Sequence, residues 1–223
     1  MRAGRTSIWL ARHGQTLANR ERRYLGRGDS PLTPWGTAQT ARLARRLRPH
    51  PFDVVVSSPS LRALTLAQQV VQARTAMLQH DPAWAEVAHG TWEGLTWRDV
   101  LARHGAAAHA RFAEPWHGRA SGGESLAEVH RRVFDAWHAL LTTWAGGRVL
   151  VTSHATPIQL VLCIVSGMPP HEPWRWRIDL GSLTIIDVYP AGPIVRQVNE
   201  VARGSMGVTP ADERDSAERY HDG

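Results

Sequence analysis

Residues 7–19 read Ser-Ile-Trp-Leu-Ala-Arg-His-Gly-Gln-Thr-Leu-Ala-Asn, a short apolar run followed at once by an arginine, a histidine and a glycine. The apolar part, residues 7–11, is almost continuously hydrophobic, which is typical of a parallel strand buried on both faces. Arg12 and His13 therefore stand at the carboxyl end of a predicted strand, where open α/β sheets bind their ligands.

Two further apolar runs, residues 53–57 and 148–152, end in a similar way. Arg62 follows the first run by one helical turn, and His154 follows the second. Because the carboxyl ends of parallel strands meet at one edge of a sheet, we expect two arginines and two histidines to converge there. A lone histidine after a strand is more often structural, so the prediction depends on this convergence. Guanidinium groups beside imidazoles suit a dianionic phosphate.

Helix signals follow each of the predicted strands. Caps and apolar periodicity predict helices at four places, which begin at Thr33-Pro34, at Ser58-Pro59, at residue 125 and at residue 156. Two late strands are predicted over residues 182–189 and 194–201. This alternation indicates an α/β fold, a three-layer αβα sandwich with a mostly parallel central sheet. The domain covers residues 1–201, and the polar segment 202–223 is predicted to be a flexible tail.

Composition limits the class of protein. The 223 residues suit one domain, and no apolar run approaches the ~18 residues that cross a bilayer. A single cysteine, Cys163, excludes an internal disulfide and fits the cytoplasm, and we see no secretion signal. All 26 basic residues are arginine, but they are scattered and form no nucleic-acid motif, so we expect no nucleic-acid partner. No zinc-type ligand spacing occurs, and we expect neither metal nor cofactor.

Taken together, the polar motifs resemble the histidine phosphatase superfamily, which includes cofactor-dependent phosphoglycerate mutase. Residues 10–19 match the ten-residue signature of that family at every constrained position. Further matching blocks follow in the expected order, namely Pro31-Leu32-Thr33 with Gly36 and Gln39, Ser57-Ser58-Pro59 with Arg62-Ala63, Glu86 with residues 90–94, Gly122-Gly123-Glu124-Ser125, and Ser153-His154. The resemblance covers residues 7–201 and implies a phosphoglycerate mutase-like fold, with residues 95–123 capping the pocket.

The resemblance implies a role for each polar residue at this edge. His13 would attack phosphorus from a neutral imidazole nitrogen, while a backbone carbonyl holds its other ring nitrogen. Arg12, Arg62 and His154 would bind the phosphoryl oxygens and stabilise the charge of the transition state. Gly14, which has no Cβ, would let the backbone approach the phosphate closely. The substrate-binding positions implied by the resemblance are Asn19, Gly14, Gln15, Thr16 and Ala155.

By the same resemblance, Glu86 is the proton donor, which would protonate the departing alkoxide and then activate the hydrolytic water. A phosphate dianion beside this carboxyl group disfavours its charged form, which suits an acid. Glu93 is the rival carboxylate, and we interpret it as structural. Because His13 must be neutral while Glu86 is protonated, we expect a mildly acidic to neutral pH optimum.

Three functions remain open for such a site. A phosphomonoesterase passes the phosphoryl group to water, a mutase passes it to a second substrate hydroxyl, and a non-catalytic descendant only binds phosphate. Mutases of the superfamily carry a Glu-Arg-x-Tyr-Gly block and use lysine, whereas residues 86–90 here read Glu-Val-Ala-His-Gly and no lysine occurs. We therefore predict a metal-independent phosphoric monoester hydrolase of the histidine acid phosphatase type. It would act in the cytoplasm on α-ribazole 5'-phosphate or a sugar phosphate, as a monomer or homodimer, without a membrane partner.

Overall fold

A six-stranded sheet forms the centre of the computed structural model, which describes residues 4–72 and 76–201. The strand order is β3-β2-β4-β1-β5-β6. The strand bounds are Thr6–Arg12 for β1, Val54–Ser57 for β2, Met77–His80 for β3, Arg148–Ser153 for β4, Ser182–Tyr189 for β5 and Gly192–Val201 for β6. Strands β1 to β4 pair in parallel, and β5 and β6 add antiparallel pairs at one edge. The prediction of a mostly parallel sheet is confirmed.

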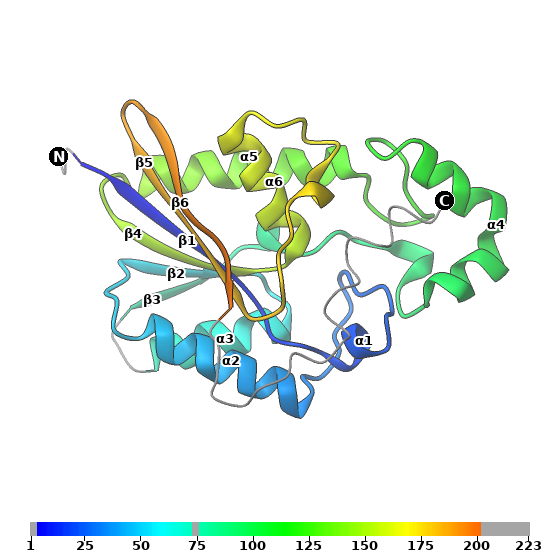
Figure 1. Ribbon diagram of the computed structural model, residues 1–223, viewed down its shortest axis with the longest axis horizontal. Helices are drawn as coiled ribbons and strands as arrows, with labels where there is room; N and C mark the ends of the chain where they lie inside the picture. Colours follow the sequence, from blue (N-terminus) through cyan, green and yellow to red (C-terminus); the bar gives the residue numbers. More distant parts are fainter. Residues whose placement is uncertain (1–3, 73–75, 202–223) are drawn as a thin grey trace.

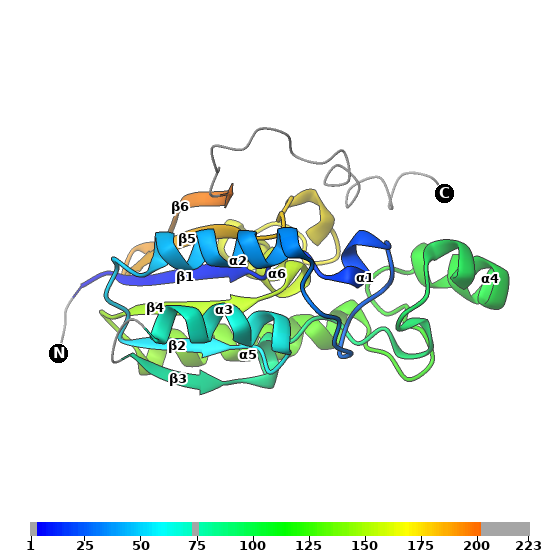
Figure 2. The same ribbon diagram turned by 90° about the horizontal axis from the view of Figure 1, so that it is seen from below.

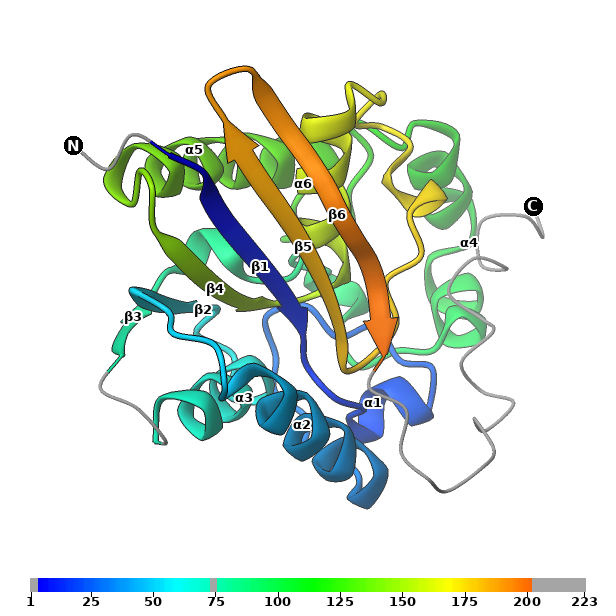
Figure 3. The ribbon, with the colours of Figure 1, turned by 60° about the vertical axis from the view of Figure 1, so that its left-hand side comes forward.

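Helices cover both faces of the sheet, which confirms the predicted three layers. Helices α2 (Pro34–Leu47) and α3 (Leu61–Val71) lie on one face, and α5 (Leu126–Thr143) and α6 (Ala155–Ser166) lie on the other (Figure 1 and Figure 3). Beyond the strand ends lie α1 (Leu17–Arg20) and α4 (Trp97–Ala113), with α4 farthest from the sheet (Figure 2). Three short 3₁₀ helices complete the described elements: η1 (Pro82–Trp84), η2 (Gly90–Trp92) and η3 (Pro173–Arg175).

Strand β1 shows why this sequence fixes one register. Ile8 and Leu10 pack in the core with α5 and α6, whereas Trp9 and Ala11 pack in the core with α2 and α3. All four side chains are at most 4% exposed. Burial of one large apolar side chain contributes about 1.5–3 kcal/mol, and a slip by one residue would exchange the two sets of side chains. The strand therefore holds Arg12 and His13 at its carboxyl end.

Local sequence signals predict the start of α2 correctly but misplace the start of α3. Helix α2 begins at Pro34 as predicted, and its N-cap Thr33 accepts a hydrogen bond from the backbone N–H of Gly36. The helix predicted to begin at Ser58-Pro59 begins instead at Leu61. The Ser58 hydroxyl bonds to His154, and the Leu61 N–H donates to the Asp29 carboxylate. This N–H at the start of α3 is therefore bonded within the protein.

Strand β3 and helix α4 were not among the predicted elements. The sequence of β3, Met-Leu-Gln-His, has no β-branched residue, and three of its four residues are exposed. Helix α4 has only Val100 and Ala108 fully buried and is kinked at Gly105, so its apolar periodicity is weak. A capping box of Thr96 and Asp99 nevertheless marks its start, and this signal could have predicted the helix.

The late strands agree closely with the prediction for residues 182–189 and 194–201. The predicted tail, residues 202–223, lies outside the described residues. Within the described ranges, no helix is long and apolar enough to cross a bilayer.

Candidate active site

A pocket of about 210 Å³ lies next to the carboxyl ends of β1, β2 and β4. Arg12, His13, Arg62 and Glu86 line its inner part. Its outer wall is mainly aromatic, apolar and basic, and includes Arg23, Tyr24, Leu25, Arg111, Phe112, Pro115, Pro173 and Trp174. Three of these residues, Arg111, Phe112 and Pro115, belong to segment 95–123, so this segment forms part of the pocket wall.

The His13 imidazole is fixed in one tautomer. Its Nδ1 atom lies 2.7 Å from the carbonyl oxygen of Gly14, and this oxygen can only accept. Nδ1 therefore carries the hydrogen, and the lone pair belongs to Nε2, as expected for a nucleophile held by a backbone carbonyl. His13 is 3% exposed. Burial, with the positive charges of Arg62 and Arg12, holds the pKa of His13 well below 6.5 against the opposing Gly14 hydrogen bond. The ring is thus neutral at physiological pH.

His154 lies beside His13, with 5.1 Å between the two ring centroids. Its Nε2 atom is 2.8 Å from the hydroxyl oxygen of Ser58. Its Nδ1 atom is buried and has no hydrogen-bond partner among the described residues. Burial is the main reason that the pKa of His154 is well below 6.5, and the positive charges of Arg62 and Arg12 add to it. Where the Ser58 hydroxyl donates to Nε2, Nδ1 carries the hydrogen, and the residues that line the pocket include Ala155 and Thr156 but not His154.

The two arginines of the inner pocket are held by backbone carbonyls. Arg62, 2% exposed, donates from Nη1 to Gly28 and from Nη2 to Gly26, both over 2.7 Å. Arg12 donates to the carbonyl oxygen of Ile178. Carbonyls orient a guanidinium without cancelling its charge. The inner pocket therefore combines positive charge with neutral imidazoles, which suits a phosphate dianion.

Glu86 and Glu93 have different environments. Glu86 lines the pocket, and its carboxylate accepts from the Val87 N–H over 2.9 Å and lies 3.5 Å from the Thr156 N–H at the start of α6. Glu93 accepts from the backbone N–H groups of Gly26 and His89 over about 3.0 Å. The carboxylate of Glu93 thus joins two loops, which agrees with its interpretation as structural.

A family model described as the histidine phosphatase superfamily (branch 1) matches residues 8–201. The chain belongs to this superfamily. The adenosylcobalamin/alpha-ribazole phosphatase of Escherichia coli is 31% identical over 199 residues, which are 88% of this chain and 97% of that protein. The solved alpha-ribazole phosphatase of Shigella flexneri is 29% identical with a TM-score of 0.82, covering 90% of this chain and all of that chain.

A bifunctional protein of Mycobacterium tuberculosis is 35% identical over 197 residues. The match covers 87% of this chain but only 54% of that protein, so the chain spans about half the length of its mycobacterial relatives. Both the resemblance to histidine phosphatases and the predicted phosphoglycerate mutase-like fold are confirmed.

Not every position implied for substrate binding lies at the pocket of this chain. Asn19 and Ala155 line it, whereas Gly14, Gln15 and Thr16 do not. Thr16 and Asn19 form the capping box of α1, which fixes the Asn19 side chain at the pocket wall. The Gln15 side chain accepts from the Thr33 hydroxyl over 2.9 Å and faces α2.

Gly14 packs closely against helix α2. A Cβ atom on Gly14 would lie 2.2 Å from the carbonyl oxygen of Gly36 and 2.7 Å from the hydroxyl oxygen of Thr40. A Cβ on Gly36 would in turn lie 1.9 Å from the carbonyl oxygen of Gln15. The two glycines let the loop after β1 pack directly on α2.

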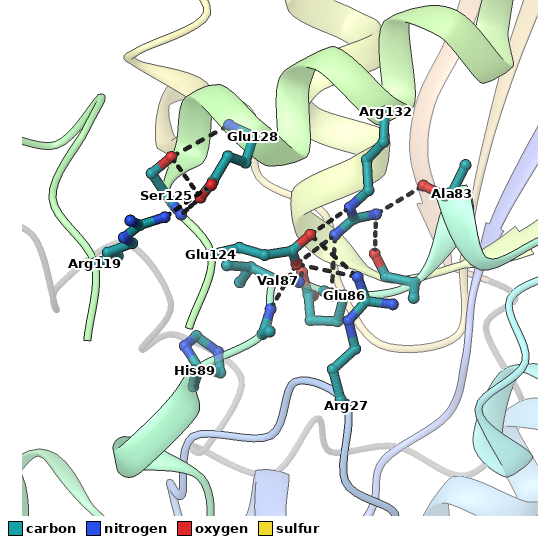
Figure 4. Close-up of polar contacts among 12 residues, drawn as sticks. Arg27, Ala83, Glu86, Val87, His89, Arg119, Glu124, Ser125, Glu128 and Arg132 are labelled. Atoms are coloured by element: carbon teal, nitrogen blue, oxygen red, sulfur yellow. Dashed lines mark hydrogen bonds and ion pairs between the residues drawn. The ribbon is translucent and has the colours of Figure 1, made fainter. Parts of the chain in front are cut away.

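The contacts of two residues near the pocket, Ser58 and Glu124, escaped the sequence analysis. Ser58 was interpreted as a helix cap, but its hydroxyl bonds to His154. Glu124 was quoted as part of a family block without a role. It forms ion pairs with Arg27 and Arg132 beside Glu86 (Figure 4). Helical periodicity separates Arg132 from its exposed neighbour Arg131, because Arg132 lies three residues after Val129 and four before Ala136, beside the buried face of α5. The bonding partners of Arg132 are visible only in the structure.

Proposed function

We propose that this chain is a metal-independent phosphomonoesterase that hydrolyses a small phosphorylated metabolite through a phosphohistidine on His13. The observation that carries the proposal is the state of the His13 ring, which is neutral, tethered at Nδ1 and placed beside Arg12 and Arg62. A neutral imidazole with one free nitrogen is a nucleophile, and the guanidinium groups bind the phosphoryl oxygens it attacks.

In the first half-reaction, His13 Nε2 attacks phosphorus in line with the departing ester oxygen. Arg12, Arg62 and the Nδ1–H of His154 stabilise the charge on the equatorial oxygens. Glu86 gives its proton to the leaving alkoxide, and the free alcohol departs. In the second half-reaction the Glu86 carboxylate takes a proton from water, which attacks the phosphohistidine. Inorganic phosphate leaves, and the neutral imidazole and the carboxylic acid are restored.

The substrate we propose is α-ribazole 5'-phosphate or a sugar phosphate. Support comes from the relatives that are named for α-ribazole phosphatase activity. The outer wall of the pocket also contributes, because Tyr24, Phe112 and Trp174 offer flat apolar surface to a ring in the alcohol portion. The enzyme would act in the cytoplasm as a monomer or homodimer.

The test is a substrate panel that contains α-ribazole 5'-phosphate, sugar phosphates, 3-phosphoglycerate and p-nitrophenyl phosphate. Phosphate release and phosphoglycerate isomerisation are measured together. We expect phosphate release with preference for one ester, and an alkali-stable, acid-labile phosphate on the protein after a quench. His13→Asn should lose at least about 10⁴-fold in turnover and all covalent phosphate, whereas exposed His109→Asn serves as the control.

Two outcomes would contradict this proposal. Isomerisation without phosphate release would make the chain a mutase. Binding of phosphate esters without turnover or covalent phosphate would make it a non-catalytic binding protein.

A further inference from the structure

Arg132, on α5, uses every one of its five N–H donors beside the pocket (Figure 4). Its Nε donates to Glu124 over 2.9 Å, and its Nη2 donates to the second oxygen of the same carboxylate over 3.0 Å. The three remaining hydrogens go to carbonyl oxygens, those of Ala83 and Ala85 at 2.7 Å and that of Glu86 at 3.1 Å. One guanidinium thus binds the backbone that carries Glu86.

Glu124 completes this contact from the other side. Its carboxylate accepts from the Ala88 N–H over 2.9 Å, and its own N–H donates to the Ala88 carbonyl oxygen over 2.9 Å. Burial opposes ionisation of this carboxyl group, but the bonds from Arg132 and Ala88 and the charge of Arg27 lower its pKa below the ordinary value. The side chains of Arg132 and Glu124 are 17% and 20% exposed. The pair is a charged, largely buried clamp on residues 83–88.

The clamp also reaches the phosphate-binding side of the pocket. Arg27 donates to the Glu124 carboxylate over 3.1 and 3.2 Å. Arg27 lies between Gly26 and Gly28, whose carbonyl oxygens hold Arg62. A continuous set of hydrogen bonds therefore joins the loop that orients Arg62 to the segment that carries Glu86.

We propose that Arg132, oriented by Glu124, is a positioning residue that holds the Glu86 carboxyl group where it can protonate the leaving oxygen. This inference rests on the proposed role of Glu86 as the proton donor. Residues 85–89 form no helix or strand between η1 and η2, so their position depends on bonds to neighbouring segments, and the Arg132 and Glu124 side chains supply several of these. A shift of about 1 Å in a reacting group can cost about 10²-fold in rate. The clamp bonds directly to the backbone on both sides of Glu86, so its loss would allow such a shift.

The experiment compares Arg132→Gln and Glu124→Gln with the matched control Arg119→Gln. Arg119 also forms an ion pair with a glutamate of α5, Glu128, over 2.7 Å, but both are exposed and neither touches residues 83–88. The readout is kcat/KM for butyl phosphate and for p-nitrophenyl phosphate. Butoxide needs a proton from Glu86 in order to leave, whereas p-nitrophenolate leaves without one.

We expect Arg132→Gln to lower kcat/KM about 10- to 100-fold with butyl phosphate and less than about threefold with p-nitrophenyl phosphate. Glu124→Gln should show the same split to a smaller extent, and Arg119→Gln none. Thermal unfolding of each variant reports its folded fraction. If Arg132→Gln does not fold at the assay temperature, the milder Glu124→Gln tests the positioning role by the same comparison of kcat/KM for the two esters.

Equal losses with both esters would overturn the positioning role, because a general loss of structure does not distinguish leaving groups. Glu86→Gln separates this failure from failure of the proposed function. If Glu86→Gln shows the split and the Arg132 and Glu124 variants do not, only the positioning role is wrong. If Glu86→Gln shows no split, the assignment of Glu86 as proton donor fails.

Discussion

Acidification should destabilise this protein through the two buried histidines of the site. Burial and the nearby guanidinium groups hold the pKa values of His13 and His154 well below 6.5. The unfolded chain takes up a proton on each ring as the pH falls through about 6.5, while the folded protein does not. Because the unfolded state then binds more protons, the free energy of unfolding must decrease as the pH is lowered.

The size of the effect follows from the same linkage. For a ring that stays neutral in the folded protein down to pH 5, the change from pH 7.5 to pH 5.0 removes about 2 kcal/mol of stability. The pair His13 and His154 together would remove up to about 4 kcal/mol. Carboxylates whose pKa values are lowered, such as Glu124 and Glu128, lose their contribution only at lower pH.

Urea unfolding at pH 7.5 and 5.0 measures the difference directly. In the double variant with His13→Asn and His154→Gln, the free energy of unfolding should decrease less between pH 7.5 and pH 5.0 than in the unmodified protein. The difference should be most of this ~4 kcal/mol. His109→Asn, at an exposed position, should leave the pH dependence as it is. If the double variant were as sensitive to pH as the unmodified protein, the argument that the folded site keeps both rings neutral would be refuted.

Two further predictions concern the metal and the loop after β1. EDTA should leave phosphatase activity intact, since Arg12 and Arg62 supply the positive charge of the site; loss of activity that a divalent ion restores would contradict this. Gly36→Ala should destabilise the protein by about 1–3 kcal/mol, because its Cβ would lie 1.9 Å from the Gln15 carbonyl oxygen. Urea unfolding checks it, and unchanged stability would show that the helix contact is not tight.

Local sequence signals predicted the parts of the fold whose formation depends on local chemistry. The apolar runs of β1 and β4 and the Thr33 cap of α2 are visible in the sequence alone, because a few neighbouring residues determine them. Strand β3 forms because it pairs with β2, and its exposed side chains carry no pattern. Helix α4 packs through only two fully buried residues, so its apolar pattern was too weak to recognise.

The site shows the same division. The sequence pointed to residues that stand directly after strands, such as His13 and His154, because strand ends meet at one edge. It did not separate Gln15 and Thr16, which face away from the pocket, from Asn19, which lines it. Their orientation depends on the capping box of α1 and the packing against α2, and the signature alone shows neither contact.

The partners of each arginine distinguish ligand binding from structural support. Arg132 is held by both oxygens of the half-buried Glu124 carboxylate, so its charge is neutralised within the protein. Arg62 is held by the carbonyls of Gly26 and Gly28, and its nearest carboxylate, Asp29, is 3.6 Å away and 47% exposed. The ion pair with Asp29 is long and half-exposed, so it compensates the buried charge of Arg62 only in part until an anion arrives. This incomplete compensation is the physical reason to place the phosphate at Arg62 and the supporting clamp at Arg132.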